Sequence, residues 1–274
     1  MNRIILITGA SSGIGKSCYE YLAAQGYTVF GTSRSVNSGF HSDDAMGPRI
    51  IRMDVSSDES VLEAVDLLVR ETGRIDVVVN NAGISVVGSM EDTAMEEARS
   101  VLETNFWGAV RVSKAVLPVM RKQGGGYIIN IGSMGGVIGL PFQAFYSASK
   151  FALAGMSEAL RMEVRPYGVH VILVEPGDFR TGITEHRKRA VRSGRKTCYS
   201  GRFERVLAII ERGERKGSHP SRVALLIDRI IKSSHPKSRY RIGKPKELLA
   251  VCLKNGIPGW VFEQLARGYW NLRE

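Results

Sequence analysis

Short apolar runs rich in valine and isoleucine alternate along this chain of 274 residues with longer segments of helical periodicity. This alternation is typical of repeated strand–helix units, whose strands line up in a mostly parallel sheet. Several runs, such as 169–174, are almost continuously apolar, as expected for strands covered by helices on both faces. We therefore predict one doubly wound α/β domain, with strands near 3–8, 27–32, 49–53, 75–80, 126–132, 169–175 and 240–243.

The helices are expected between these strands, and two segments fall outside the alternation. Residues 182–220 form a basic excursion after the sixth strand, and residues 245–274 form an aromatic-rich tail. Ligands of doubly wound folds bind at the carboxyl ends of the strands, so the excursion is expected to cover such a site as a lid. Helices are predicted near 14–25, 57–72, 94–122 with a break around Thr104 and Asn105, 147–166 and 221–233.

The positive charge of the chain is concentrated in one segment. The net charge is +11, and residues 180–222 alone contain thirteen Lys and Arg against four Glu. The rest of the chain is close to neutral, which argues against a nucleic-acid-binding protein. A basic segment of this kind also suits contact with an anionic membrane surface, so peripheral membrane contact remains open.

Cysteine and histidine usage excludes several other classes. Three widely spaced cysteines form no CxxC pair, which argues against a disulfide framework and fits a reducing compartment. The scattered histidines match no ligand spacing, so we expect no metal. A strand-like run starts at Ile4 and no apolar run reaches about 18 residues, so neither a signal peptide nor a membrane span is expected. These observations predict a cytoplasmic protein.

A glycine-rich turn joins the first predicted strand to the first helix, in the run 8–15. Gly9, Gly13 and Gly15 supply a sharp turn, close backbone approach and tight helix–strand contact. The start of the following helix offers free N–H groups to phosphate oxygens. The turn therefore predicts a dinucleotide site, with Ser11, Ser12 and Ile14 as its other contacts.

The ends of the next strands refine this prediction. The second strand ends in Ser33-Arg34 without a carboxylate, and an arginine suits a 2′-phosphate, so NADP(H) is favoured over NAD(H). Asp54 and Val55 after the third strand are expected to contact the adenine. Asn81, Ala82 and Gly83 after the fourth strand are expected at the cofactor ribose.

The catalytic candidates lie later in the chain. Tyr146 and Lys150 are four residues apart on one predicted helix face, and Ser133 ends the fifth strand. A phenol has an ordinary pKa of about 10, and a nearby ammonium is expected to lower it. Tyr146 is then the proton donor to a carbonyl oxygen, Ser133 holds that oxygen, Lys150 also binds the cofactor ribose, and Asn105 fixes a water beside Lys150. The pattern predicts a hydride-transferring oxidoreductase.

Together these motifs resemble the short-chain dehydrogenase/reductase family, in its single-domain branch. The resemblance covers residues 1–181 and includes Pro176, Gly177 and Thr181. It implies a Rossmann-type sheet of seven strands, a nicotinamide cofactor touched by these three residues, and a catalytic set of Asn105, Ser133, Tyr146 and Lys150. It also implies a homodimer or homotetramer built on helices 105–122 and 147–166. The stretch 139–153 is similar to 17β-hydroxysteroid dehydrogenases and retinol or acyl-lipid reductases.

The substrate is the least determined part of the prediction. Apolar or small residues between the candidate serine and tyrosine favour a lipophilic ketone or alcohol, such as a steroid, retinoid or acyl lipid. The expected substrate contacts are Ser133, Met134, Val137, Gly139, Phe142 and Tyr146. A non-catalytic NADP-sensing or scaffold protein on the same fold is the alternative. Enoyl reductases and extended-branch epimerases fit less well.

Overall fold

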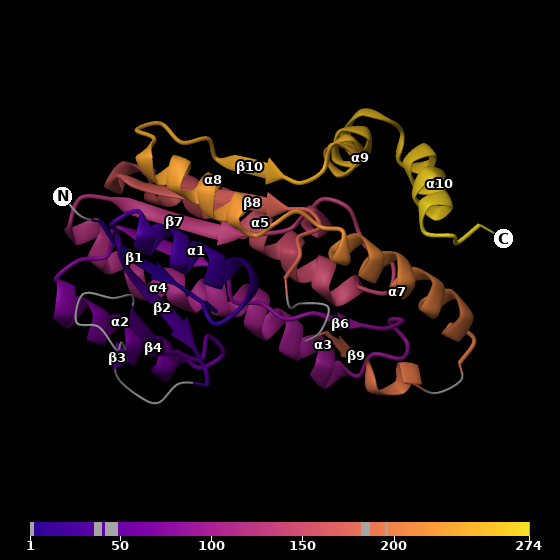
Figure 1. The fold of residues 1–274 in the computed structure, drawn as a ribbon, viewed down its shortest axis with the longest axis horizontal. Coiled ribbons are helices and arrows are strands. Elements are labelled where there is room, and N and C mark those ends of the chain that lie inside the picture. The colour runs from indigo at the N-terminus through magenta and orange to yellow at the C-terminus, as the bar shows by residue number, and fades with distance from the viewer. Residues whose placement is uncertain (1–2, 36–39, 42–48, 182–186, 195–196, 274) are drawn as a thin grey trace.

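The computed structural model describes residues 3–35, 40–41, 49–181, 187–194 and 197–273 (Figure 1). Seven parallel strands form the central sheet, as predicted, and the two-residue strand β3 (Phe40–His41) adds an antiparallel edge. The spatial order is β10 (Arg239–Ile242), β8 (Val169–Pro176), β7 (Gly126–Ile131), β5 (Val77–Asn80), β1 (Ile4–Ile7), β2 (Thr28–Ser33), β4 (Arg49–Arg52) and β3.

The strand order reverses between β1 and β5. These neighbours pair in parallel from Ile5 with Val77 to Ile7 with Val79. From β1 the chain moves outward through β2 and β4, and from β5 it moves the other way through β7 and β8. A crevice forms at such a switch point, at the carboxyl ends of the strands, so the topology itself selects the place for a ligand.

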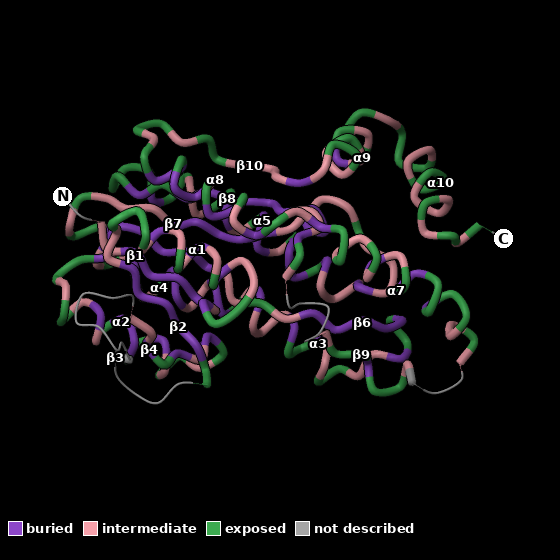
Figure 2. The backbone as a smooth tube through the Cα atoms, viewed as in Figure 1, coloured by how far each residue is buried: buried purple, intermediate pink, exposed green. Residues whose placement is uncertain are grey.

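Helices cover both faces of the sheet and produce two apolar cores. Helices α1 (Gly13–Ala24) and α8 (Ser221–Lys232) pack on one face. Helices α2 (Asp58–Thr72), α4 (Gly108–Lys122) and α5 (Ala144–Val164) pack on the other. The strands of the sheet are correspondingly buried (Figure 2), which explains their continuous apolar runs. The predicted doubly wound class is confirmed.

The long helical segment predicted at 94–122 is interrupted where expected. Helix α3 (Met95–Leu102) and α4 are joined by one turn of π-helix, Glu103–Trp107. Such turns are frequent at functional sites, because they redirect one side chain without ending the helix. The redirected turn contains Asn105, which is 2% exposed. Helix α5 begins three residues earlier than predicted, so Tyr146 lies in its first turn.

The described residues of the segment after β8 form a strand as well as the helix that the sequence indicates. Strand β9 (Lys188–Arg189) pairs in parallel with β6 (Val86–Val87), forming a small second sheet beside α3. Helix α7 (Ser200–Arg215) follows and packs Phe203 and Leu207 against Val87.

The C-terminal helices α9 (Pro245–Gly256) and α10 (Gly259–Tyr269) lie beyond the end of the sheet (Figure 1). They are mostly exposed (Figure 2). Among the described residues, none of the helices combines the length and apolarity that a membrane crossing needs.

Candidate active site

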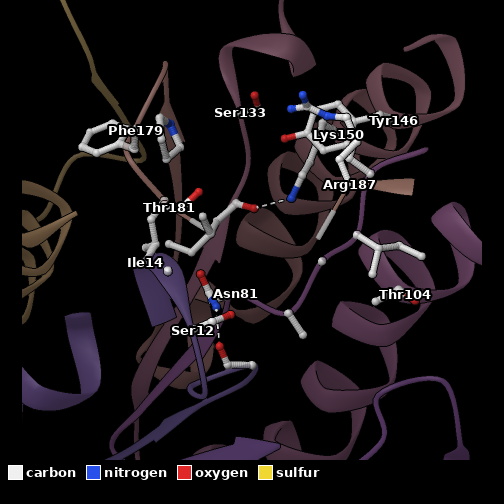
Figure 3. A pocket seen from close by; sticks show the side chains of 18 of the residues that line it. Ser12, Ile14, Asn81, Thr104, Ser133, Tyr146, Lys150, Phe179, Thr181 and Arg187 are labelled. Atoms are coloured by element: carbon white, nitrogen blue, oxygen red, sulfur yellow. Dashed lines mark hydrogen bonds between the residues drawn. The ribbon is translucent and has the colours of Figure 1, made fainter. Parts of the chain in front are cut away.

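One cavity of about 780 Å³ opens at the carboxyl ends of the parallel strands. Its wall contains the turn after β1, the end of β2, the segments after β4 and β5, Ser133 after β7 and the end of β8. Figure 3 shows Ser133, Tyr146, Lys150 and Arg187 grouped at one end, and Ser12 and Asn81 at the other. The cavity therefore joins the predicted cofactor residues to the predicted catalytic residues.

The glycine turn is constrained at each of its three glycines. Gly9 and Gly13 have φ of +65° and +57°, a region that L side chains rarely adopt. A Cβ added to Gly15 would lie 2.2 Å from the carbonyl oxygen of Gly9, so this glycine permits helix α1 to approach the turn. Gly15 itself does not line the cavity, whereas Gly9, Ser11, Ser12, Gly13 and Ile14 do.

The start of α1 is suited to a phosphate group. Ser12 is the N-cap residue but makes no capping hydrogen bond, and the first turn of the helix carries no acidic side chain. The free N–H groups and the positive end of the helix dipole therefore face the cavity without competition. Together with the glycine turn, these features fit the pyrophosphate of a dinucleotide.

A hydrogen-bond clamp fixes the segment after β5 against the glycine turn. The amide nitrogen of the Asn81 side chain donates to the carbonyl oxygens of Thr8 and Gly9, at 3.0 and 3.1 Å. The hydroxyl of Thr8 accepts from the backbone N–H groups of Asn81 and Ala82, both at 3.0 Å. The side chain of Asn81 is thus used to position backbone, and Asn81, Ala82 and Gly83 all line the cavity.

The far end of the cavity, beyond β2 and β4, carries the residues predicted to select the cofactor. Ser33, Arg34, Asp54 and Val55 all line it, and Arg34 is exposed. Burial raises the pKa of the Asp54 carboxyl, but hydrogen bonds from Ser56 and the charge of Arg34 outweigh that effect, so the pKa is lowered. Asp54 therefore stays ionised beside the arginine.

At the opposite end, Tyr146 and Lys150 project together from the first two turns of α5. The Ser133 hydroxyl is close enough to the Tyr146 phenol to lower its pKa. The Lys150 ammonium lies 5.8 Å from the centroid of the Tyr146 ring and donates to the carbonyl oxygen of Ile131 at 2.9 Å. Ser133 follows the last residues of β7, and its hydroxyl accepts from the N–H of Gly135 at 3.0 Å. These three side chains form one constellation.

The pKa values of Tyr146 and Lys150 differ from those expected from the sequence. Burial raises the pKa of Tyr146 more than the Ser133 hydroxyl lowers it. Burial also lowers the pKa of Lys150 to about 8. The pKa of Tyr146 is therefore raised and not lowered as expected, because burial of the phenol outweighs the groups that lower it. The phenol keeps its proton at neutral pH and is a donor.

Asn105 supports the site from behind the cavity wall. Its side-chain amide donates to the carbonyl oxygen of Ile84 at 3.0 Å and to the Ser149 hydroxyl at 3.1 Å, and its carbonyl accepts from the N–H of Ile84 at 2.7 Å. The π-helical turn thus connects the segment after β5 to helix α5. Its role in holding a water beside Lys150 stays a prediction.

The end of β8 and the residues after it line the cavity next to the glycine turn. Pro176, Gly177 and Thr181 all line it, as expected of contacts to a nicotinamide. A Cβ added to Gly13 would lie 3.2 Å from Cβ of Thr181, so the two segments nearly touch. This is where the two ends of the cavity meet.

Only some of the predicted substrate residues line the cavity. Ser133 and Tyr146 line the cavity, whereas Met134, Val137, Gly139 and Phe142 do not. Phe142 instead packs its ring on Phe203 of α7, with centroids 5.5 Å apart. The expected substrate contacts did not include the cavity residues of the later part of the chain, although these residues lie largely in the predicted lid and the aromatic-rich tail: Asp178, Arg187, Ile209, Ile210, Glu214, Tyr269 and Trp270.

Comparison with known proteins agrees with this geometry. Residues 3–192 match the family described as short chain dehydrogenase. The chain is 43% identical over 271 residues to a 3-ketodihydrosphingosine reductase of Bacteroides thetaiotaomicron, covering 99% of each chain. It is 34% identical to retinol dehydrogenase 8 of Bos taurus over 257 residues, covering 87% of this chain and 81% of that protein.

Among solved structures, a short-chain dehydrogenase from Streptomyces avermitilis aligns with a TM-score of 0.81 and 29% identity, covering 97% of this chain and 98% of the other. The protein belongs to the short-chain dehydrogenase/reductase family of oxidoreductases, whose fold holds a nicotinamide cofactor. The predicted likeness to retinol dehydrogenases is confirmed.

Proposed function

We propose that this protein is an NADP(H)-dependent oxidoreductase that interconverts a lipophilic ketone and its secondary alcohol. The observation that carries the proposal is the single cavity that joins the glycine turn to Ser133, Tyr146 and Lys150. A site that holds a dinucleotide and a buried acid within one cavity is suited to transfer of a hydride and a proton to one carbonyl group.

The chain's own residues divide the chemistry between them. A bound nicotinamide cofactor supplies the hydride. Tyr146, whose raised pKa keeps the phenol protonated, donates its proton to the carbonyl oxygen. Ser133 donates a hydrogen bond to the same oxygen, and Lys150 binds the ribose hydroxyls and holds positive charge near the phenol. Oxidation of the alcohol uses the same groups in reverse.

The preference for NADP(H) over NAD(H) rests on the end of β2. Arg34 lines the cavity there, beside the hydroxyls of Ser33 and Ser35, whose Oγ atoms are 3.0 Å apart. A guanidinium and two hydroxyls suit a 2′-phosphate, and no carboxylate follows β2 directly to bind a free 2′-hydroxyl.

The proposed substrate class is a long-chain keto lipid, with 3-ketodihydrosphingosine as the first compound to test. Support comes from the relative of that name, which matches almost the whole chain. Apolar side chains from three separate segments line the substrate end, namely Leu140, Ile209, Ile210, Tyr269 and Trp270. In this proposal α7 and the C-terminal helices act as the lid over the lipid chain.

Two surface features support further parts of the proposal. The π-helical turn before α4 exposes Trp107, and helix α5 exposes Phe151 and Met162; these side chains are 48%, 46% and 70% exposed. Large apolar side chains of this kind suit the helix-to-helix contact of a homodimer.

The C-terminal helices expose Trp260 and Leu249, which are 73% and 58% exposed, in a segment that also carries lysines and arginines. This combination suits peripheral contact with an anionic membrane.

Consumption of NADPH in the presence of 3-ketodihydrosphingosine, retinal, a steroid ketone and a small ketone tests the proposal. We expect turnover of the long-chain ketone, and Tyr146→Phe should lower it by about 10²–10⁴-fold while the protein still binds NADPH. Turnover retained by Tyr146→Phe would exclude the proposed acid. NADPH binding without turnover of any ketone would favour the sensor alternative.

A further inference from the structure

Arg187 is buried in the wall of the cavity with part of its hydrogen-bonding capacity unused. Its side chain is 3% exposed, and its Nη2 forms an ion pair with Glu214 of α7. Its Nε and Nη1 are buried and have no hydrogen-bond partner among the described residues. A buried donor without a partner is destabilising, so the site is arranged for an acceptor that comes from a ligand.

Two carboxyl groups accompany this guanidinium on the same wall. Glu214 is 12% exposed, and Asp178 lies against the backbone of α7, since a Cβ added to Gly213 would be 2.4 Å from its Oδ2. Burial, Glu247 and Glu214 together raise the pKa of Asp178 to about 6. Carboxyl groups that the fold holds close together in a buried place are stabilised by a cation between them.

The three side chains surround the reacting end of the cavity. Asp178, Arg187 and Glu214 all line it, and the charge of each one shifts the pKa of the Tyr146 phenol. Arg187 lies beside Tyr146 and Lys150 in Figure 3. A polar group that reaches these side chains is therefore only a few atoms away from the carbonyl that Tyr146 protonates.

We propose that Arg187, Glu214 and Asp178 form a head-group site for a substrate that carries a hydroxyl and an ammonium group close to its reacting carbonyl. The free N–H groups of Arg187 donate to the hydroxyl, and the two carboxylates accept from the ammonium. This inference rests on the proposed function, because it assigns the orientation of the ketone that Tyr146 reduces. Long-chain 2-amino-1-hydroxy-3-ketones carry both groups.

The balance of charge argues against an anionic head group. Glu214 neutralises Arg187 through their ion pair, and Lys244 and Lys246 offset the effect of burial and of Glu214 and Glu247 on Asp178 only in part. A carboxylate or phosphate of the ligand would meet Glu214 and Asp178 at close range in a buried place, where repulsion between like charges is strong. A hydroxyl can accept hydrogen bonds from Arg187, and an adjacent ammonium can pair with the carboxylates of Glu214 and Asp178.

Calorimetric titration of the NADP⁺-loaded protein tests the site without turnover. The ligands are a long-chain 2-amino-1,3-diol, its N-acetyl derivative, its 1-deoxy analogue and a plain long-chain 3-alkanol. We expect the amino diol to bind at least about tenfold tighter than the N-acetyl or 1-deoxy compound, since each of these analogues loses a hydrogen bond to a charged group. Glu214→Gln should remove the preference for the free amine, and Arg187→Gln the preference for the 1-hydroxyl.

Arg189→Gln is the matched control, because Arg189 lies two residues after Arg187 and forms an exposed pair with Glu204 of the same helix, α7. If Arg187→Gln does not fold, Arg187→Lys keeps the charge and removes the fork of donors. Equal losses for all ligands, no binding of the amino diol, or tighter binding of an analogue with a carboxylate in place of the amine would each overturn the proposal. Failure of the proposed function is separate: ketones are then not reduced, although the amino diol binds.

Discussion

The cofactor end and the substrate end of this cavity are built from different parts of the molecule. At the cofactor end, short turns at the carboxyl ends of β1 and β5 place backbone atoms, and side chains such as Asn81 serve to hold that backbone. At the substrate end, side chains from α7, the residue before β9 and the C-terminal segment meet across long sequence separations, as Arg187 and Glu214 do. A turn that needs particular backbone conformations requires particular residues close together in the chain, so it can be recognised as a sequence motif. Contacts between side chains from distant segments produce no such motif.

The difference has a functional consequence. The cofactor end offers groups that any dinucleotide needs, so its residues indicate the family and the cofactor class. The substrate end offers an apolar wall next to a compact group of charges, which selects among substrates. Substitutions at the cofactor end should therefore change cofactor binding, and substitutions at the substrate end should change the reaction or the choice of substrate. Lys150 belongs to both ends, so its substitution should change both properties.

Lys150→Met is expected to have the largest effect. Removing the ammonium takes away the charge next to Tyr146 and the proposed contact with the cofactor ribose, so kcat should fall by about 10²–10⁴-fold and NADPH should bind more weakly. Steady-state kinetics and fluorescence titration measure the two effects. Lys114→Met on α4 is the control. A variant with normal kcat would break the assignment of Lys150 to the catalytic set.

Arg34→Asp should change only the cofactor end. Loss of a charged hydrogen bond to the 2′-phosphate should weaken NADPH binding by about tenfold to a hundredfold, and NADH binding should be little affected. The dissociation constants of both cofactors provide the measurement. Arg52→Asp, on an exposed residue at the end of β4 that does not line the cavity, controls for the change of charge. Equal weakening of both cofactors would remove the basis for preferring NADP(H).

Gly15→Ala should lower stability and cofactor affinity together. The added methyl group would meet the Gly9 carbonyl oxygen and the Asn81 side chain at 2.2 and 2.4 Å, and overpacking of this kind costs about 1–3 kcal/mol. Gly201→Ala, in helix α7 where the nearest atom is 3.8 Å away, is the control and should be neutral or slightly stabilising. Denaturant unfolding compares them. An unchanged free energy of unfolding for Gly15→Ala would contradict the close helix approach.

Asp178→Asn should have the smallest effect, visible as a pH dependence of stability. Asp178 faces Glu214 and Glu247 and is partly offset by Lys244 and Lys246, and its pKa is about 6 instead of the ordinary 3.8. Between these values the folded protein keeps a proton that the unfolded chain has lost, so the contribution of Asp178 to stability falls as pH rises through that window.

Asparagine has no carboxyl group to ionise, so Asp178→Asn removes the loss of stability that Asp178 causes at higher pH. The rise in Tm caused by Asp178→Asn should therefore be greater at about pH 8 than at about pH 4.5. Asp66→Asn, on the exposed face of α2, controls for the loss of one negative charge. Equal shifts at both pH values would show that Asp178 does not titrate in this window.

The sequence predicts the sheet and the catalytic constellation because both rest on local patterns. The seven parallel strands and the break near Asn105 are confirmed. The four-residue spacing places Tyr146 and Lys150 together on α5, next to Ser133. The raised pKa of Tyr146 was not predictable, because it depends on how deeply the folded chain buries the phenol.

The residues that line the substrate end of the cavity could not be predicted from local sequence patterns. Phe142 has the apolar character expected of a substrate contact, but α7 covers it with Phe203. Arg187 and Glu214 belong to a segment whose sequence shows only excess positive charge, and their ion pair exists because β9 pairs with β6 and α7 packs beside it. Neither the pairing nor the burial follows from composition.

The most direct test of the central claim is transfer of deuterium in a single turnover. The protein is loaded with NADPH carrying deuterium at both C4 positions, mixed with 3-ketodihydrosphingosine, and the product is analysed by mass spectrometry. The account predicts one deuterium on the carbinol carbon of the product, and none in the same time with Tyr146→Phe. Product without deuterium, or equal transfer by Tyr146→Phe, would contradict the claim that this cavity joins a nicotinamide cofactor to Tyr146 as its acid.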